Sequence, residues 1–351
     1  MFFRNRREIN FEQNSFDILK YWAAFSVMFL HYTYYAFMEA KQAWGFMDRL
    51  RYISEYFPGI IVLFTISGFL IYDSMERSES KQEFLKKRVF RLYPELWLCT
   101  IVNLLVLLVI AREYLDGSIL VWTGAQVFGI AYTPSCLDGF ATGSVNGALW
   151  TIFVEVQLYL IICFGYQFLK KLKKWQWGLF LLVFAGLNLL CAFISSICGG
   201  IVSKLIERSC VPYAIWFMIG VFCYQYKEKV IQWLKYLLLP MLIVYSFVRP
   251  HGMEHMGYYI GIGISILCPF IVIGAAYLLP PMRFKVDLSY GMFLYHWIIL
   301  NIIVHFELLQ EWKWYICLGF FSVSTLLLAW ISKRLTREIM RGFKRKKKGK
   351  I

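Results

Sequence analysis

Ten apolar segments constrain this chain more than any other feature, and all but the short sixth and seventh are close to the length that crosses a bilayer. A helix needs about twenty mostly apolar residues to span the hydrocarbon layer. Hydrophobic residues make up 59% of the chain and aromatic residues 19%, which is too apolar for a soluble domain. The sequence therefore predicts an all-α, polytopic membrane helix bundle with about ten transmembrane helices. The segments are 16–37, 56–74, 94–112, 149–168, 176–197, 211–226, 235–248, 257–279, 287–305 and 314–332.

The basic residues predict the orientation of this bundle. Lys and Arg concentrate in the cytoplasmic connections of membrane proteins. If the N-terminus is cytoplasmic, 29 of the 37 Lys and Arg residues fall on the inner side. Topology then accounts for the formal charge of +15, so no nucleic-acid partner is expected. We predict a multi-pass protein of the cell (cytoplasmic or inner) membrane with both termini in the cytoplasm.

The connections between the segments hold no separate soluble domain. Residues 1–340 are expected to form a single integral membrane domain, and residues 341–351 a basic cytoplasmic tail that contacts anionic lipid. The largest polar connections are an inner loop over 75–93 and an outer loop over 113–148.

The nine cysteines include no CxxC pair and no Cys/His cluster with metal spacing, so no metal is expected. Most of them lie in apolar runs. Cys136, Cys198 and Cys210 fall in predicted outer loops, where one disulfide is compatible with the sequence but its pairing is not fixed.

Two ionisable residues stand out in the first segment. Lys20 and His31 are eleven residues apart, which places them within about 20° of one helical face and roughly 16 Å apart along the axis. Ionisable residues inside a membrane helix usually face a polar interior, where a neutral imidazole can accept a proton. The alternative is a histidine that only hydrogen-bonds a neighbouring helix.

Polar residues also mark the second and third segments. Arg88 and Arg91 are three residues apart, so they are neighbours on one helical face, and guanidinium groups suit phosphate oxygens. From composition alone, an orientation signal without a ligand is favoured over phosphate binding. Ser67 and Gly68 lie inside the second span, where small residues usually allow close helix packing, and the close approach of a ligand is the alternative.

Glu155 lies in the outer half of the fourth span, shortly after an Asn146-Gly147 turn and Trp150. A carboxylate at the depth of His31 suits general acid–base chemistry, although a structural Glu–His hydrogen bond would have the same pattern.

The ninth segment adds Tyr290 at its inner entrance and His296 deeper inside. Alone these two residues say little, because Tyr and Trp at a membrane boundary are ordinary interfacial anchors.

Taken together, these stretches resemble the acyltransferase-3 family of integral membrane acyltransferases over nearly the whole chain. Lys20 stands where the family more often has arginine, which keeps the charge but weakens bidentate phosphate binding. No SGNH-type esterase domain is expected in cis. The elements that carry the resemblance are, in order, Lys20 to His31, Ser67-Gly68-Phe69, Arg88 to Arg91 before Pro94, Leu149-Trp150 to Glu155 with Asn146 nearby, and Ser289-Tyr290 with Tyr295-His296-Trp297.

The resemblance implies transfer of an acyl group, most often acetyl from acetyl-CoA, to a hydroxyl of a cell-surface glycan or lipid-linked saccharide. Acetyl-CoA would be the co-substrate, and membrane lipid would surround the domain. His31 would act as general base or relay the acyl group, and Glu155 would orient it or bind the sugar. The expected cofactor-binding residues are Lys20, Arg88, Arg91 and Ser67. The candidates for contacting the substrate or an oxyanion are Asn146, Trp150, Tyr290 and His296, with Ser67 as a further oxyanion donor.

Two other classes of protein fit parts of this pattern. A multi-pass secondary transporter with an intramembrane His/Glu proton relay would also use a basic inner vestibule. Transporters commonly show repeated halves, whereas the motifs of the first four spans have no counterpart in the last four. A scaffold without catalysis leaves the Lys20–His31 and Arg88–Arg91 placements unexplained. We therefore favour the enzyme over the transporter, and the transporter over the scaffold.

Overall fold

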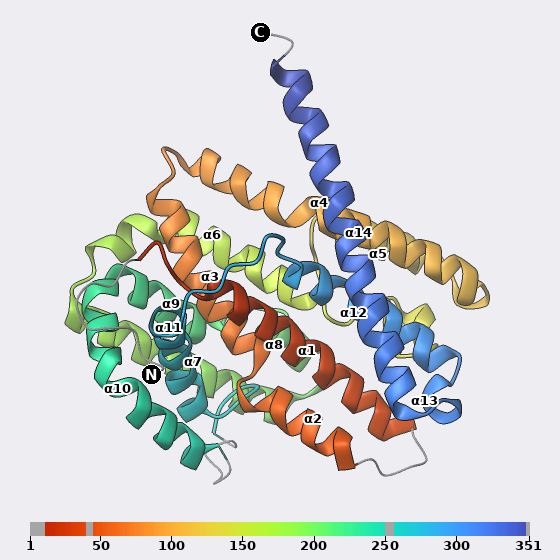
Figure 1. Cartoon of the computed structure of the whole chain (residues 1–351), viewed down its shortest axis with the longest axis horizontal. Coiled ribbons are helices and arrows are strands. Elements are labelled where there is room, and N and C mark those ends of the chain that lie inside the picture. Colours follow the sequence, from red (N-terminus) through yellow and green to blue (C-terminus); the bar gives the residue numbers. More distant parts are fainter. Residues whose placement is uncertain (1–10, 40–44, 250–255, 349–351) are drawn as a thin grey trace. The chain divides into compact units, whose positions relative to one another are not determined.

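The structure is a computed structural model that describes residues 11–39, 45–249 and 256–348. Within these ranges every regular element is a helix (Figure 1), which confirms the all-α prediction. Two short 3-10 helices are η1 (Arg112–Tyr114) and η2 (Ser135–Leu137). The α-helices are α1 (Phe16–Glu39), α2 (Gly45–Tyr56), α3 (Gly59–Glu76), α4 (Lys81–Ile110), α5 (Ser118–Val127), α6 (Trp150–Lys171), α7 (Lys174–Cys198), α8 (Gly200–Glu207), α9 (Ala214–Gln225), α10 (Lys227–Val248), α11 (Ile262–Leu278), α12 (Ser289–His305), α13 (Leu308–Glu311) and α14 (Trp314–Lys348).

Each predicted apolar segment overlaps one of the main helices α1, α3, α4, α6, α7, α9, α10, α11, α12 and α14. α9 and α11 are shorter apolar helices. The chain is an integral membrane protein, while the ten crossings and the cytoplasmic placement of both termini stay predictions. Six helical stretches of the described chain are long and apolar enough to cross a membrane: Gly45–Glu76, Lys81–Ile110, Trp150–Lys171, Lys174–Cys198, Lys227–Val248 and Trp314–Gly342.

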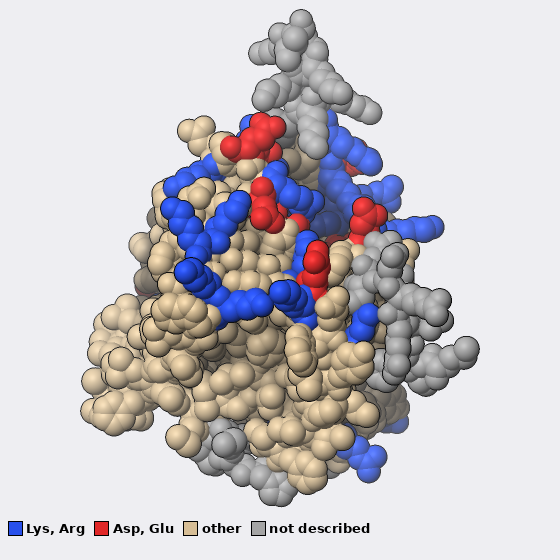
Figure 2. Space-filling view, turned by 90° about the vertical axis from the view of Figure 1, so that its left-hand side faces the viewer, with Lys and Arg blue, Asp and Glu red and all other residues tan. Residues whose placement is uncertain are grey.

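The surface agrees with this assignment. Figure 2 shows basic and acidic side chains gathered toward one end of the face it presents, while most of the rest of that face carries neither. Such a separation of charged from uncharged surface is typical of a protein that stands in a bilayer.

Helix α4 differs from the prediction at its start. The third span was expected to begin at Pro94, after a polar loop over 75–93. The helix instead begins at Lys81 and runs through Pro94 to Ile110. The polar stretch before the proline is therefore mostly helix.

Side-chain hydrogen bonds at its first turn explain the early start of α4. The Ser80 hydroxyl oxygen accepts a 3.1 Å hydrogen bond from the Glu83 backbone N–H, and the Glu83 carboxylate accepts one of 2.8 Å from the Glu79 backbone N–H. A serine followed three residues later by glutamate is a known signal for a helix start. Because α4 continues past them, Arg88 and Arg91 lie on one helix, as their spacing predicts.

The connections contain helices that hydropathy did not predict. They are α2, α5, α8 and α13. In α2, the buried residues Met47, Leu50 and Ser54 follow a helical spacing, but the charged residues between them lower the mean hydropathy. All nine cysteines are free thiols, including the three in predicted outer loops.

The chain divides into two compact units, which are described separately. Unit 1 comprises residues 1–23, 56–86 and 154–285, and unit 2 comprises residues 24–55, 87–153 and 286–351. Because α1, α4 and α6 cross these limits, each of them contributes to both units.

In unit 1, α3 and α9 approach closely at two glycines. A Cβ on Gly68 would lie 2.0 Å from the carbonyl oxygen of Phe217, and one on Gly220 would lie 2.2 Å from that of Thr65. Only glycine fits at such a distance from a backbone atom. The structure thus confirms the packing explanation for Gly68.

In unit 2, α12 packs along α14. A Cβ on Gly291 of α12 would lie 2.7 Å from the Cβ of Ala329 in α14, so these helices also meet closely. Helix α14 continues from its apolar part to Lys348, so the predicted basic tail begins on this helix.

Candidate active site

Two histidines of unit 2, His31 on α1 and His296 on α12, are in direct contact. The His31 Nδ1 atom lies 2.9 Å from the His296 Nε2 atom. The two rings are stacked at 10° to each other with their centroids 5.2 Å apart. His296 is completely buried, whereas His31 is only half-buried. The structure therefore brings together two residues that the sequence singled out separately, and of the two His31 is the one with exposed surface.

The hydrogen bonds around this pair assign its protons. The His296 Nδ1 atom lies 3.2 Å from the carbonyl oxygen of Met292. A carbonyl oxygen only accepts, so Nδ1 of His296 carries the proton and its Nε2 is the acceptor in the neutral ring. His31 then donates its Nδ1–H to His296, and the lone pair of His31 is on Nε2. This tautomer makes His31 a proton acceptor.

An aromatic residue and a loop support the pair. The Trp297 and His31 rings pack in a T-shaped arrangement, with the centroids 4.7 Å apart and the planes at 77°. The Trp297 Nε1–H donates to the Thr142 hydroxyl at 2.9 Å, and Thr142 in turn donates to Asn301 Oδ1 at 2.6 Å. Asn301 also donates two hydrogen bonds of 3.0 Å to backbone carbonyls of the same loop. Neither Thr142 nor Asn301 was predicted from the sequence, because neither belongs to a recognised motif.

The Asn146-Gly147 turn lies against the same helix. The Asn146 side-chain amide donates to the Leu294 carbonyl oxygen at 2.8 Å and accepts from the Ala148 backbone N–H at 3.2 Å. A Cβ on Gly147 would lie 2.4 Å from the Trp297 ring, so the turn needs a glycine there. These contacts hold the turn on α12, and an oxyanion role for Asn146 stays a prediction.

In unit 1, the second predicted catalytic residue, Glu155, is held by two hydroxyl groups. Ser67 donates to its Oε1 atom at 3.0 Å, and the Tyr159 hydroxyl donates to the same oxygen. Ser67 is buried and Glu155 half-buried. Within the described residues, no hydrogen bond reaches the Oε2 atom. The structure thus joins Ser67 to Glu155 and adds Tyr159, which the spacing of four residues from Glu155 could have identified.

The predicted cofactor-binding cations occupy helical positions. Lys20 forms a 3.1 Å ion pair with Asp17 in the first turns of α1. On α4, Arg88 is half-buried, whereas Arg91 is exposed and lines an open groove. That Lys20, Arg88 and Arg91 bind a common phosphate stays a prediction. The approach of Glu155 to His31 also stays a prediction.

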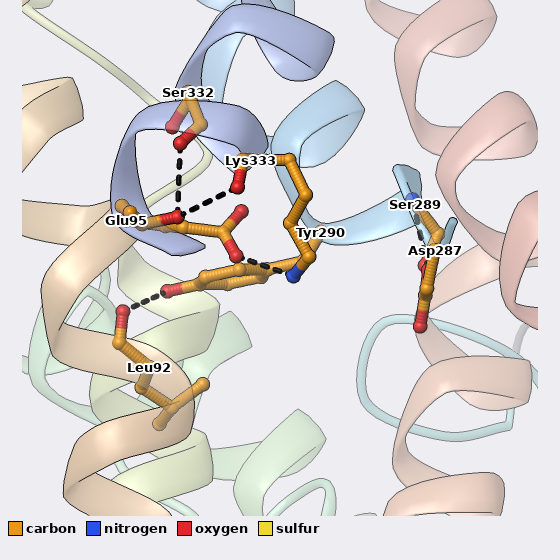
Figure 3. Close-up of polar contacts among 8 residues, drawn as sticks. Leu92, Glu95, Asp287, Ser289, Tyr290, Ser332 and Lys333 are labelled. Atoms are coloured by element: carbon orange, nitrogen blue, oxygen red, sulfur yellow. Dashed lines mark hydrogen bonds and ion pairs between the residues drawn. The ribbon is translucent and has the colours of Figure 1, made fainter. Parts of the chain in front are cut away.

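The last two predicted residues have structural surroundings. The Tyr290 hydroxyl donates to the Leu92 carbonyl oxygen at 3.1 Å (Figure 3), which ties α12 to α4. Trp150 is the first residue of α6 and is half-buried. Their proposed contacts with substrate stay predictions.

Comparisons with known proteins agree with the resemblance seen in the sequence. Residues 13–334 match the model of the acyltransferase domain of the acyltransferase-3 family. The chain is 26% identical over 343 residues to nodulation protein 10 of Rhizobium leguminosarum bv. viciae, covering 91% of each chain. It is 23% identical over 312 residues to a protein named O-acetyl transferase from Shigella phage Sf6, covering 84% of this chain and 86% of that protein. No solved structure shows a significant match. Because the family model covers nearly the whole described chain, this protein belongs to the acyltransferase-3 family of membrane acyltransferases.

Proposed function

We propose that this protein transfers an acyl group, specifically acetyl, from cytoplasmic acyl-CoA to a hydroxyl of a cell-surface glycan or lipid-linked saccharide. The observation that carries the proposal is the His31–His296 contact, which leaves a lone pair on His31 Nε2. Family membership supports acyl transfer. The similarity to a protein named O-acetyl transferase supports acetyl as the group and oxygen as the acceptor atom. The saccharide acceptor rests on the family resemblance.

The chemistry follows from the position of the His31 lone pair. His31 Nε2 removes the proton of the acceptor hydroxyl while the hydroxyl oxygen attacks the thioester carbonyl. A carbon–oxygen bond forms, the carbon–sulfur bond breaks, and the proton passes from His31 to the departing sulfur. During the step His31 is an imidazolium, and His296 stabilises it by accepting the Nδ1–H hydrogen bond.

The remaining predicted residues take supporting roles in this proposal. Lys20, Arg88 and Arg91 bind the donor phosphates on the cytoplasmic side, with Ser67 near the donor. The rise along α1 from Lys20 to His31 is roughly 16 Å, which is comparable with the length of a pantetheine arm. Glu155 offers its Oε2 atom to a sugar hydroxyl or helps to orient His31.

A transfer assay with purified protein tests the proposed function. Protein in lipid nanodiscs is mixed with radiolabelled acetyl-CoA and a polysaccharide extract of the cells that make it. We expect label to appear in the saccharide fraction as base-labile ester. Vesicle uptake of a solute with no consumption of acetyl-CoA would overturn the proposal in favour of the transporter.

His296 is a positioning residue in this mechanism, and two substitutions separate that role from packing. His296→Leu removes the acceptor for the His31 Nδ1–H, and we expect kcat to fall about tenfold to a hundredfold with little change in KM. His296→Gln keeps an acceptor oxygen at similar reach, so it should restore most of the activity. Steady-state kinetics at equal amounts of folded protein provides the measurement. An equal loss of kcat in His296→Leu and His296→Gln would show that His296 acts only by filling space and not as a hydrogen-bond acceptor.

Gly147 supports His31 through Trp297. Gly147→Ala pushes the indole ring and therefore His31, and we expect transfer to fall about tenfold to a hundredfold, since a shift of about 1 Å has such an effect. The control is Gly319→Ala on α14, where an added Cβ meets no atom within 4 Å. Initial rates of both variants are compared with wild type. Unchanged activity in Gly147→Ala would rule out this support.

A further inference from the structure

An open groove of about 430 Å³ lies between α4 and α14 in unit 2. Its charged lining consists of Arg91 and Glu95 from α4, and Lys333, Arg337 and Arg341 from α14. Only Arg91 among them was predicted to bind a ligand. The groove is formed where the polar parts of both helices meet, since the apolar part of α4 follows Glu95 and that of α14 precedes Lys333.

One ion pair neutralises part of this lining. Figure 3 shows the ion pair between Lys333 and Glu95. Lys333 Nζ lies 2.5 Å from Glu95 Oε1, and the Glu95 side chain is only 6% exposed. The Glu95 Oε2 atom is also buried, and no described residue donates a hydrogen bond to it. A buried acceptor of this kind is costly unless a donor satisfies it. Because this atom is buried, a ligand in the groove does not reach it, and Glu95 contributes only its ion pair with Lys333.

The remaining lining is strongly positive. Arg341 forms an exposed pair with Glu338 at 2.5 Å, which holds it only weakly. No described residue pairs with Arg337 through a hydrogen bond or ion pair. Even with Lys333 paired to Glu95 and Arg341 paired to Glu338, the basic side chains that line the groove outnumber the acidic ones.

The arrangement on α14 suits an anion with several oxygens. Lys333, Arg337 and Arg341 recur every four residues, so they share one face of the helix. The same three residues also line an adjacent groove of about 270 Å³, together with Arg334 and one carboxylate, Glu338. Guanidinium groups bind phosphate oxygens with two parallel hydrogen bonds, and this geometry favours phosphate over a single negative charge.

We propose that Arg91, Arg337 and Arg341 bind a phosphate ester with at least two negative charges. Two molecules carry this chemistry at a membrane surface: the phosphorylated nucleotide of an acyl-CoA donor and the headgroup of an anionic lipid. Occupancy by the donor rests on the proposed function, whereas the phosphate site itself does not.

Binding measurements on the full-length protein in nanodiscs test the site. The probes are coenzyme A and dephospho-coenzyme A, which lacks one phosphate, and calorimetry gives both affinities. We expect wild type to prefer coenzyme A, and the double variant Arg337→Gln/Arg341→Gln to bind it about tenfold or more weakly because charged hydrogen bonds are lost. The Arg337→Lys/Arg341→Lys variant keeps the positive charge but cannot form the two parallel hydrogen bonds of a guanidinium group. Its affinity for coenzyme A should lie between those of wild type and the double glutamine variant.

A neighbouring arginine on α14 is the matched control. Arg334 borders only the smaller groove and stands over the Trp330 ring, so Arg334→Gln should leave coenzyme A affinity within about twofold. Size-exclusion chromatography confirms that each variant is folded.

A lipid arm separates the two sources of phosphate. Phosphatidylglycerol retained by each variant is counted by native mass spectrometry. If the double variant loses this lipid but keeps its coenzyme A affinity, the groove is a lipid headgroup site and the donor assignment is wrong. If neither ligand is affected, the phosphate site is refuted. A third outcome is that coenzyme A binds wild type and the double variant binds it more weakly, but the protein shows no transfer activity. That outcome would support the phosphate site and reject the proposed function.

Discussion

Replacing His31 with alanine is expected to lower acyl transfer by about a hundredfold to ten-thousandfold, the range contributed by a positioned general base. His31 Nε2 holds the lone pair that removes the acceptor proton, because its Nδ1–H is engaged by His296. No other group of the pair can take this role, since His296 is completely buried. The rate is measured as release of the coenzyme A thiol by purified protein with the acceptor present.

A third histidine of unit 2 provides the control for this variant. His305 is exposed at the end of α12, and His305→Ala should retain wild-type activity. His31→Ala should also bind coenzyme A as wild type does, because the phosphate-binding residues are unchanged. Activity of His31→Ala above about a tenth of wild type would rule out general-base catalysis by His31.

Gly68→Ala is expected to lower the free energy of unfolding by about 3 kcal/mol, at the upper end of the usual cost of overpacking. The added Cβ would lie 2.0 Å from a backbone oxygen of α9, which cannot rotate away as a side chain would. Moving α3 from α9 would also move Ser67, which holds Glu155. The melting temperature in detergent, followed by fluorescence-detected size exclusion, should therefore fall by several degrees, and transfer should fall with it.

A glycine of α6 serves as the control for Gly68. An added Cβ at Gly165 meets no other atom within 4 Å, so Gly165→Ala should keep the wild-type melting temperature. Equal melting temperatures for the two variants would contradict the close contact of α3 and α9.

Most helices were predictable from the sequence, because backbone groups in a membrane must be satisfied within their own segment. Each long apolar run therefore corresponds to one helix. Hydropathy does not predict amphipathic helices such as α2, because the charged residues on one face lower the mean hydropathy of the segment. The early start of α4 was missed although Ser80 and Glu83 carry its signal.

The candidate site was predictable as a set of residue types but not as a set of contacts. The motifs identified His31, Ser67, Glu155 and His296. The contact of His31 with His296 joins residues 265 positions apart, so it depends on how α1 and α12 pack. For this reason His296 was predicted to contact substrate, whereas its burial and hydrogen bonds favour a role in positioning His31.

The basic face of α14 shows a different limit. Lys333, Arg337 and Arg341 were attributed to membrane orientation and a basic tail, because any cytoplasmic flank is rich in such residues. Their spacing of four residues indicates a shared helical face, but the groove that it forms with Arg91 requires the position of α4. Composition alone cannot separate an orientation signal from a binding site.

The O-acetyl content of surface glycans, measured by NMR in cells that carry each variant at equal abundance, decides whether this protein is the acyltransferase proposed above. The variants are wild type, His31→Ala, Arg88→Ala, Glu155→Ala and His305→Ala, with abundance matched by immunoblot. We predict a clear O-acetyl signal for wild type and His305→Ala, and its loss for His31→Ala and Arg88→Ala. Unchanged acetylation in His31→Ala at normal abundance would contradict the mechanism and direct attention to transport.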